Sequence, residues 1–289
     1  MKILSLFAVI CLGVVDIRFV VASPTRQLNG GKVVNGQDAI PGSHPHQVTL
    51  QWYLFGSWFH ICGGSVIDDL FVLTAAHCVD FAPAEQFRVV VNDHNLYNTD
   101  GDEQFIGIQR IYTHEKWLPG QDYDYKLYPN DIAVLRLDSE VLDKTTIIHM
   151  ADDDNEDFTG DLCTISGWGR NDTNGIVPNT LQEVNMTVMN QTDCNAFWKD
   201  IFPDAMLDIF QGQICIFSGE DPESGASACS GDSGGPMVCN GVLAGVTSWG
   251  VQGCRDPVTR EFRPSVYVRV SYYYPWIQNV QNLYQIGRG

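Results

Sequence analysis

The sequence predicts an all-β protein, built as a sandwich or a barrel. Short apolar or alternating runs recur along the 289 residues, and clusters of Gly, Pro, Asn and Asp separate them. This spacing is typical of antiparallel strands joined by tight turns. Helical periodicity is confined to two segments, 193–199 and 272–284; in the second, Trp276, Val280 and Leu283 recur on one face.

The expected strands are rich in β-branched and aromatic side chains, which suit a pleated and half-buried surface. No linker or internal repeat separates them, so the chain forms one large domain or two smaller halves. In chain order the strands are HQVTLQWYL, GGSVIDDLFVLTAAH, FRVVV, QFIGIQRIY, DIAVLRL, DLCTISGWG, LQEVNMTVM, PMVCNGVLAGVTSWG and SVYVRV.

The first residues have the pattern of a secretory signal. Lys2 supplies the positive start, residues 3–15 the apolar stretch, and Val20-x-Ala22 the small-residue cleavage site. The apolar run is too short to be a membrane anchor. We therefore expect residues 1–22 to be a signal peptide and the protein to be secreted.

Charge and cysteine content narrow the function further. The net charge of −18 at pH 7 disfavours nucleic acids and anionic membranes as partners. Of the nine cysteines, Cys11 lies in the signal, and an even number in a secreted chain predicts disulfides whose pairing the count leaves open. No CxxC pair is present, which disfavours a zinc site.

The stretch SACSGDSGGPMVCNG, residues 227–241, surrounds Ser233 with glycines. A serine hydroxyl is a weak nucleophile unless a base, a group that orients the base and donors for an oxyanion lie beside it. Gly231 allows its backbone N–H to approach a substrate carbonyl, and Gly234 and Gly235 allow a tight turn. A glycine-rich hairpin without chemistry is the alternative.

Two further motifs supply the other groups. VLTAAHCVD places His77 after an apolar strand, and NDIAVLRL places Asp131 before one. Taken singly, such a histidine is more often structural and such an aspartate is usually a turn residue. With Ser233 they follow the order His, Asp, Ser, which is one known order of a catalytic triad. An esterase on another fold is disfavoured by that order.

Five motifs together resemble one family. TAAHC, DIAVL, GWG, GDSGGP and SWG stand here in the order of the trypsin/chymotrypsin-like serine proteases, and the resemblance runs from Val33 to the C-terminal helix. It implies two antiparallel six-stranded β-barrels packed together with a C-terminal α-helix. The protease domain is then 33–289, with halves at 33–145 and 146–275.

The resemblance also implies catalytic roles. Ser233 is expected to attack the scissile carbonyl, His77 to take and return its proton, and Asp131 to orient the imidazole. The N–H groups of Gly231 and Ser233 are expected to form the oxyanion hole. Ser248 is expected to support Asp131.

Substrate residues follow from the same resemblance. The edge at Ser248, Trp249 and Gly250 is expected to pair with an extended substrate. Ser227 stands at the pocket base, where trypsin-like members carry an aspartate, so a basic substrate side chain would lack compensation for its desolvation. Gly250 leaves one wall open and Ser265 narrows the base. We expect cleavage after Leu, Met, Phe or Tyr, with elastase-like smaller residues as the alternative; three arginines in 255–263 leave acidic substrates open.

LNGGKVVNGQDA resembles the activation junction of the family's zymogens. Cleavage after Lys32 would release a propeptide, 23–32, and free the amino group of Val33, which is expected to pair with Asp232 and align Gly231. The alternative is a surface aspartate and a tail that never inserts. His60 matches the position that often holds this aspartate before activation, although it also fits simple packing.

The resemblance implies four disulfides, which use all eight remaining cysteines and leave none to tether the propeptide. They are Cys62–Cys78, Cys163–Cys239, Cys194–Cys215 and Cys229–Cys254.

NDHNLYNTDGDEQF resembles the family's calcium loop, because oxygen ligands on a turn suit Ca²⁺. A solvated acidic loop is the alternative. The expected ligands are Asp93, Asn95, Asn98, Asp100 and Glu103. Sequons at Asn171, Asn185 and Asn190 are candidate glycosylation sites.

The sequence therefore predicts a secreted serine endopeptidase that needs no cofactor for catalysis and can carry structural Ca²⁺. Expected partners are protein or peptide substrates, an activating trypsin-like protease and protein protease inhibitors, and the protein is expected to be a monomer. Activity should rise as His77 loses its proton near pH ~6–7, and fall above about 8 as the Val33 ammonium titrates. A protease fold that only binds is the competing class.

Overall fold

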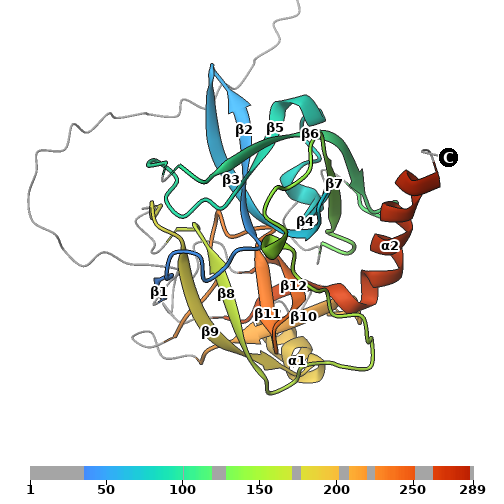
Figure 1. Ribbon diagram of the computed structural model, residues 1–289. Helices are drawn as coiled ribbons and strands as arrows, with labels where there is room; N and C mark the ends of the chain where they lie inside the picture. The colour runs from blue at the N-terminus through green and yellow to red at the C-terminus, as the bar shows by residue number, and fades with distance from the viewer. Residues whose placement is uncertain are drawn as a thin grey trace, which may run out of the picture. The chain divides into compact units, whose positions relative to one another are not determined.

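In the computed structural model, six antiparallel strands close into a first barrel (Figure 1). Hydrogen bonds join them in the order β2-β3-β4-β7-β6-β5, and β5 returns to β2. Inward-facing Val, Leu and Ile side chains fill the interior, as period-two alternation requires. The strands are β2 (Gln47–Leu54), β3 (Ser57–Asp68), β4 (Phe71–Thr74), β5 (Phe87–Val91), β6 (Gln104–Thr113) and β7 (Ala133–Leu137).

A second barrel follows in the sequence. Its strands run in the order β9-β10-β13-β12-β11-β8, and pairing of β8 with β9 closes it. A short strand, β1 (Gln37–Asp38), adds to the outside of β9 although it precedes the first barrel in the chain. The barrel strands are β8 (Leu162–Gly167), β9 (Gln182–Met189), β10 (Gln213–Phe217), β11 (Pro236–Cys239), β12 (Val242–Trp249) and β13 (Ser265–Arg269).

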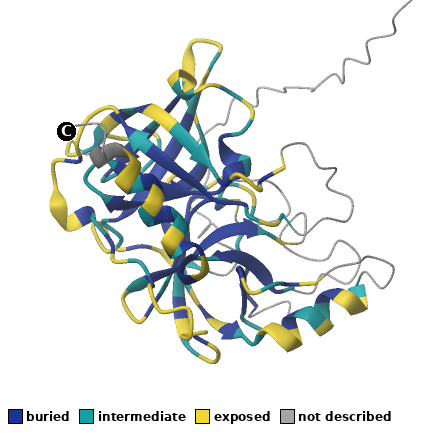
Figure 2. Cartoon of the chain, turned by 90° about the vertical axis from the view of Figure 1, so that its right-hand side faces the viewer, coloured by how far each residue is buried: buried dark blue, intermediate teal, exposed yellow. Residues whose placement is uncertain are grey.

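The two barrels confirm the predicted fold class. All described residues belong to one unit, Gly31–Gly289. Buried residues concentrate in the barrel strands and exposed ones in the connections (Figure 2). The structure describes residues 36–99, 101–118, 128–170, 177–201, 208–219, 225–250 and 263–286.

Both predicted helices are present and longer than expected. α1 (Gln191–Ile201) is preceded by Asn190, whose side-chain oxygen accepts a hydrogen bond from Asp193 N at 2.8 Å and so caps the helix. α2 (Val270–Ile286) follows the second barrel but packs its apolar face into the core of the first, so it ties the two ends of the fold together. No helix in the described part of the chain is long and apolar enough to cross a bilayer.

Three short 3₁₀ turns complete the secondary structure of the described residues: η1 (Ala76–Cys78), η2 (Ala84–Gln86) and η3 (Lys144–Thr146). The structure contains the three predicted disulfides whose cysteines are all described, Cys62–Cys78, Cys163–Cys239 and Cys194–Cys215. Cys229 is also disulfide-bonded. Cys254, its predicted partner, lies outside the described residues.

Candidate active site

His77 and Asp131 lie at the ends of two neighbouring strands of the first barrel, β4 and β7, which pair with each other. His77 lies in η1, which follows β4, and the Cys62–Cys78 disulfide ties that turn to β3. Asp131 lies just before β7. Its Oδ1 accepts a hydrogen bond from the backbone N–H of His77 at 2.9 Å, and its Oδ2 lies 2.7 Å from His77 Nδ1. Both contacts fix the imidazole relative to the carboxylate.

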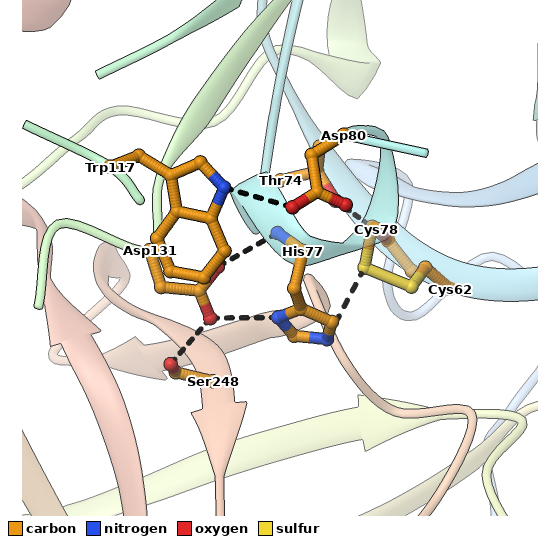
Figure 3. A network of polar contacts seen from close by, with 9 residues as sticks. Cys62, Thr74, His77, Cys78, Asp80, Trp117, Asp131 and Ser248 are labelled. Carbon is orange, nitrogen blue, oxygen red and sulfur yellow. Dashed lines mark hydrogen bonds and ion pairs between the residues drawn. A yellow bond between two sulfur atoms is a disulfide. The ribbon is translucent and has the colours of Figure 1, made fainter. Parts of the chain in front are cut away.

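Ser248, on β12 of the second barrel, completes the hydrogen bonding of Asp131 (Figure 3). Its Oγ donates to Asp131 Oδ2 at 2.6 Å. Asp131 is 0% exposed, so these three donors replace the water that a buried carboxylate loses. A hydrogen bond from Ser248 of the second barrel thus fixes Asp131 of the first barrel, and Asp131 in turn orients His77.

The environment of His77 favours its protonated form. Burial alone lowers the pKa of the imidazole, but the charge of Asp131 and its hydrogen bond outweigh burial, and the charge of Asp80 adds to them. The net result is a pKa of His77 above its ordinary value of 6.5. The ring therefore accepts a proton readily while its side chain stays 24% exposed to solvent.

The Ser233 loop is shaped by glycines whose backbone conformations L side chains rarely adopt. Gly231 has φ +104° and Gly234 has φ +74°, both in the left-handed region. A Cβ on Gly234 would lie 2.6 Å from the carbonyl oxygen of Gly63. The backbone is pinned on both sides, since Gly63 N donates to Ser233 O and Gly234 N donates to Thr247 O, each at 2.8 Å.

Two backbone donors beside Ser233 are available to a ligand. Within the described residues, no backbone hydrogen bond uses the N–H of Gly231 or of Ser233. The carbonyl of Gly231 lies 3.1 Å from His60 Nε2, and this contact orients the peptide between Gly231 and Asp232. No hydrogen bond joins the Ser233 hydroxyl to His77 among the described contacts; such bonds commonly tighten only when substrate is bound.

Asp232 is buried away from the catalytic groups. Its carboxylate accepts hydrogen bonds from the backbone N–H groups of Gly169 and Cys229, each at 2.8 Å. Burial outweighs these two bonds and raises the pKa of Asp232 to about 6. No Lys, Arg or His within the described ranges forms an ion pair with it.

His60 does not hold that carboxylate in this structure. Its Nδ1 lies 2.6 Å from Thr49 Oγ1, and its Nε2 contacts the carbonyl of Gly231. Burial lowers the pKa of His60 to about 4, so the ring is neutral at pH 7. The contact expected from the family's zymogens is therefore absent, and His60 instead orients the peptide that carries the Gly231 carbonyl.

The predicted pocket residues lie together. Ser227 and Ser265 are buried, and their hydroxyls lie 3.3 Å apart. Ser227 Oγ also donates to the carbonyl of Ala228 at 2.8 Å. A Cβ on Gly250 would lie 3.9 Å from Ser265, so Gly250 borders the same space. Trp249, beside it, packs against Trp198 with ring centroids 4.8 Å apart.

Comparison with known proteins places this geometry in a family. Residues 33–277 match the family model described as Trypsin. The chain belongs to the trypsin family. It is therefore a serine endopeptidase, and both the barrels and the residues of the predicted triad lie in the matched range.

Relatives of this trypsin-family protease carry several specificities in their names. A chymotrypsin-like serine proteinase of Haliotis rufescens is 37% identical over 250 residues, covering 85% of this chain and 90% of the relative. A chymotrypsin-like elastase family member 1 of Macaca fascicularis is 38% identical over 255 residues, covering 85% and 88%. The solved structure of neuropsin, a serine protease expressed in the limbic system of mouse brain, matches with a TM-score of 0.70 at 31% identity, covering 86% of this chain and 99% of that one.

Several predicted residues of the protease cannot be placed. Lys32, Val33, Asn171 and Asp100 lie outside the described residues, as does the segment 255–262. Asn185 is exposed on β9, where Thr164 Oγ1 donates to its side-chain oxygen at 2.8 Å. Asn190 caps α1.

The described part of the acidic loop contains hydrogen bonds between its own residues. Glu103 Oε2 accepts the N–H of Gly101 at 2.9 Å, and the carbonyl of Asn95 accepts the N–H of Asn98 at 3.1 Å. Elsewhere in the described residues, the one group of three potential ligands is Cys62, His77 and Cys78, and its two cysteines are joined as a disulfide. Among the described residues, no other group of three His, Cys, Asp or Glu side chains lies close enough together to share a metal ion.

Sequence reasoning missed one group beside His77. Asp80 accepts a hydrogen bond from Trp117 Nε1 at 3.0 Å, and Trp117 stacks against Tyr128. The position of Asp80, three residues after His77, is a signal that could have suggested it.

Proposed function

We propose that this protease is a secreted endopeptidase that cleaves after Leu, Met, Phe or Tyr through an acyl-enzyme. In this mechanism Ser233 Oγ forms a bond to the scissile carbonyl carbon as His77 Nε2 takes its proton. The carbonyl oxygen becomes an oxyanion between the N–H groups of Gly231 and Ser233. His77 then gives the proton to the leaving amine, and water repeats the sequence in reverse to release the acid.

Asp131 has a supporting role in this proposal. Its contacts with His77 N and Nδ1 keep the proton on Nδ1, so that Nε2 faces the nucleophile. Its charge stabilises the imidazolium formed in each half-reaction. The hydrogen bond from Ser248 keeps the carboxylate from turning away.

The observation that carries the specificity is the uncharged floor of the pocket. The hydroxyls of Ser227 and Ser265 lie within hydrogen-bond distance of each other, and neither side chain offers a negative charge to a Lys or Arg side chain. A cationic side chain there would lose its hydration without compensation, whereas an apolar one gains from burial. The Ser265 hydroxymethyl also narrows the floor, which favours the elastase-like alternative with smaller residues.

Activation is proposed to follow cleavage after Lys32. The new ammonium of Val33 would enter beside Asp232, which is buried and, among the described residues, accepts hydrogen bonds from two neutral backbone N–H groups. A cation there would offset the desolvation of the buried carboxylate, which is what raises the pKa of Asp232 to about 6. The position of β1, which starts at Gln37 and is fixed to β9, supports this because it holds the chain four residues from Val33.

Secretion fits the disulfides, which persist in oxidising compartments. Protein substrates, an activating trypsin-like protease, protein inhibitors and a monomeric state remain parts of the same proposal. Calcium binding by the acidic loop stays a prediction as well. Thermal unfolding with calcium and with a chelator tests it. An unfolding midpoint that is the same in both conditions would contradict calcium binding.

Hydrolysis of peptide anilides that differ only in the residue before the cleaved bond tests the function. The protein is treated briefly with trypsin, the trypsin is inhibited, and Ser233→Ala is the control. Turnover of Leu, Met, Phe or Tyr substrates that the control lacks is the expected result. Turnover of Ala and Val substrates would favour the elastase-like alternative, and turnover of Lys or Arg would contradict the pocket argument. No turnover, with Val33 shown to be the new N-terminus, would favour a protein that only binds.

A further inference from the structure

A second carboxylate, Asp80, is linked to His77 by a continuous set of contacts. Asp80 Oδ2 accepts a hydrogen bond from Trp117 Nε1 at 3.0 Å (Figure 3). The Trp117 ring stacks on Tyr128, with centroids 6.0 Å apart and planes at 20°. Tyr128 in turn meets the His77 ring edge-on at 6.1 Å. These residues come from the turn after η1 and from the segment before β7.

The hydrogen-bond donor that holds Asp80 is electrically neutral. An indole N–H fixes the direction of a carboxylate but cannot cancel its charge, as an Arg or Lys would. Arg110 lines the same surface pocket of about 400 Å³ as Asp80 and Trp117. However, its guanidinium lies over the Tyr112 ring at 5.0 Å, and no ion pair between Arg110 and Asp80 occurs in the described part of the chain. The charge of Asp80 therefore remains effective at its neighbours.

The groups that face His77 are few. Among the described residues, the charged or titratable ones are Asp131, Asp80 and Tyr128, while Ser248 and the Cys62–Cys78 disulfide contribute no charge. Asp131 is the stronger of the two carboxylates because it touches the ring directly. The charge of Asp80 acts in the same direction and raises the pKa of His77 further.

We propose that Asp80, fixed by Trp117, is a positioning residue for peptide-bond hydrolysis whose carboxylate stabilises the imidazolium form of His77 alongside Asp131. The proposal rests on the proposed role of His77 as the base. When His77 takes the proton from Ser233, the ring gains a positive charge, and both carboxylates attract it. Asp80 thus helps to set the pH at which the protease becomes active.

The pH dependence of kcat/KM on an apolar anilide tests this proposal, because that ratio reports the ionisation of the free enzyme. Asp80→Asn removes the charge but keeps an acceptor for Trp117. We expect the rising limb of the plot of kcat/KM against pH to move to lower pH by about 0.2–0.7 pH unit, because His77 loses the attraction of a partly exposed negative charge. The shift should shrink at about 1 M salt, where the Debye length falls to about 3 Å. Asp80→Glu keeps the charge and should restore the limb.

Glu85→Gln is the matched control, because Glu85 is exposed in the neighbouring turn η2 and the charge change is identical. An unchanged limb in Asp80→Asn, or an equal shift in Glu85→Gln, overturns the proposal. If Asp80→Asn does not fold, Trp117→Phe keeps the ring and removes the hydrogen bond, and an unchanged limb there also overturns it. Activity that survives Ser233→Ala or His77→Ala would instead contradict the proposed function itself.

Discussion

The hydroxyls of Ser227 and Ser265 lie 3.3 Å apart and close the floor of the proposed substrate pocket with two small polar groups. Both residues are buried, so the floor is neither charged nor open to bulk water.

Ser265→Gly should therefore deepen the pocket. Removing the hydroxymethyl makes room for an aromatic ring, and a difference of this size in a pocket changes discrimination by about tenfold. We expect kcat/KM for Phe and Tyr anilides to rise about tenfold relative to Ala and Val anilides. Ser227→Ala, which removes a hydroxyl without opening the wall, is the control. If Ser265→Gly leaves the ratio of kcat/KM for large and small anilides unchanged, a residue other than Ser265 limits the size of the substrate side chain.

Gly234→Ala should cost both stability and activity. Its φ of +74° is unfavourable for alanine, and the new Cβ would meet the Gly63 carbonyl oxygen at 2.6 Å and the Thr74 hydroxyl. Gly241 has a similar φ of +81° but nothing within 4 Å of its Cβ position. Urea unfolding should show a loss of about 1 kcal/mol for Gly241→Ala and clearly more for Gly234→Ala. Equal losses would mean that the contact with Gly63 is relieved cheaply.

The all-β class was predictable because its signals are local, whereas the two barrels were implied by the resemblance to a family. Each strand carries its own alternation and turns, and the motifs around His77, Asp131 and Ser233 each occupy a few consecutive residues. The disulfides followed from the resemblance to a family, since pairing cannot be deduced from the spacing of eight cysteines.

The remaining features depend on distant residues that only the fold brings together. Trp117 and Asp80 are separated by 37 positions, and no pattern in the chain links them. β1 was not predicted as a strand; it lies in the range 33–145 that was expected to form the first half, but it pairs with β9, more than a hundred residues away. Likewise, nothing in the sequence indicates that His60 would contact the carbonyl of Gly231 rather than Asp232.

Asp232 should make the uncleaved chain less stable as pH rises. Burial raises its folded pKa to about 6 from 3.8, so the folded state binds the proton more tightly than the unfolded state does. Stability from this group is full below pH 3.8 and is lost as pH rises through about 6, by about 3 kcal/mol for about two pKa units. After cleavage the Val33 ammonium should remove that loss.

The measurement compares urea unfolding of the cleaved and uncleaved forms from pH 4 to 7.5. The stability advantage of the cleaved form should grow with pH, and Asp232→Asn should abolish the growth. Groups outside this contact contribute equally to both forms and cancel. A constant difference between the two forms across this range would mean that Val33 does not pair with Asp232.

His46 should make the protein less stable as pH falls, which is the opposite of the effect of Asp232. This should hold for the cleaved and the uncleaved protein alike. His46 is 8% exposed at the start of β2, and burial, aided by the nearby charge of His44, lowers its pKa from 6.5 to about 4. Between these values the unfolded state binds more protons, so stability is full above pH 6.5 and falls as pH drops towards 4. The loss should be about 1–3 kcal/mol.

His46→Gln removes the titrating ring while keeping the backbone carbonyl that accepts the N–H of Val66 at 2.9 Å. Urea unfolding of this variant should depend less on pH between 6.5 and 4.5 than that of the parent protein. The exposed His149 offers a matched control, since His149→Gln changes the same type of residue outside the core. If both variants keep the slope of the parent, the acid sensitivity comes from other groups, with His60 as the next to replace because its pKa is lowered to about 4 by the same burial.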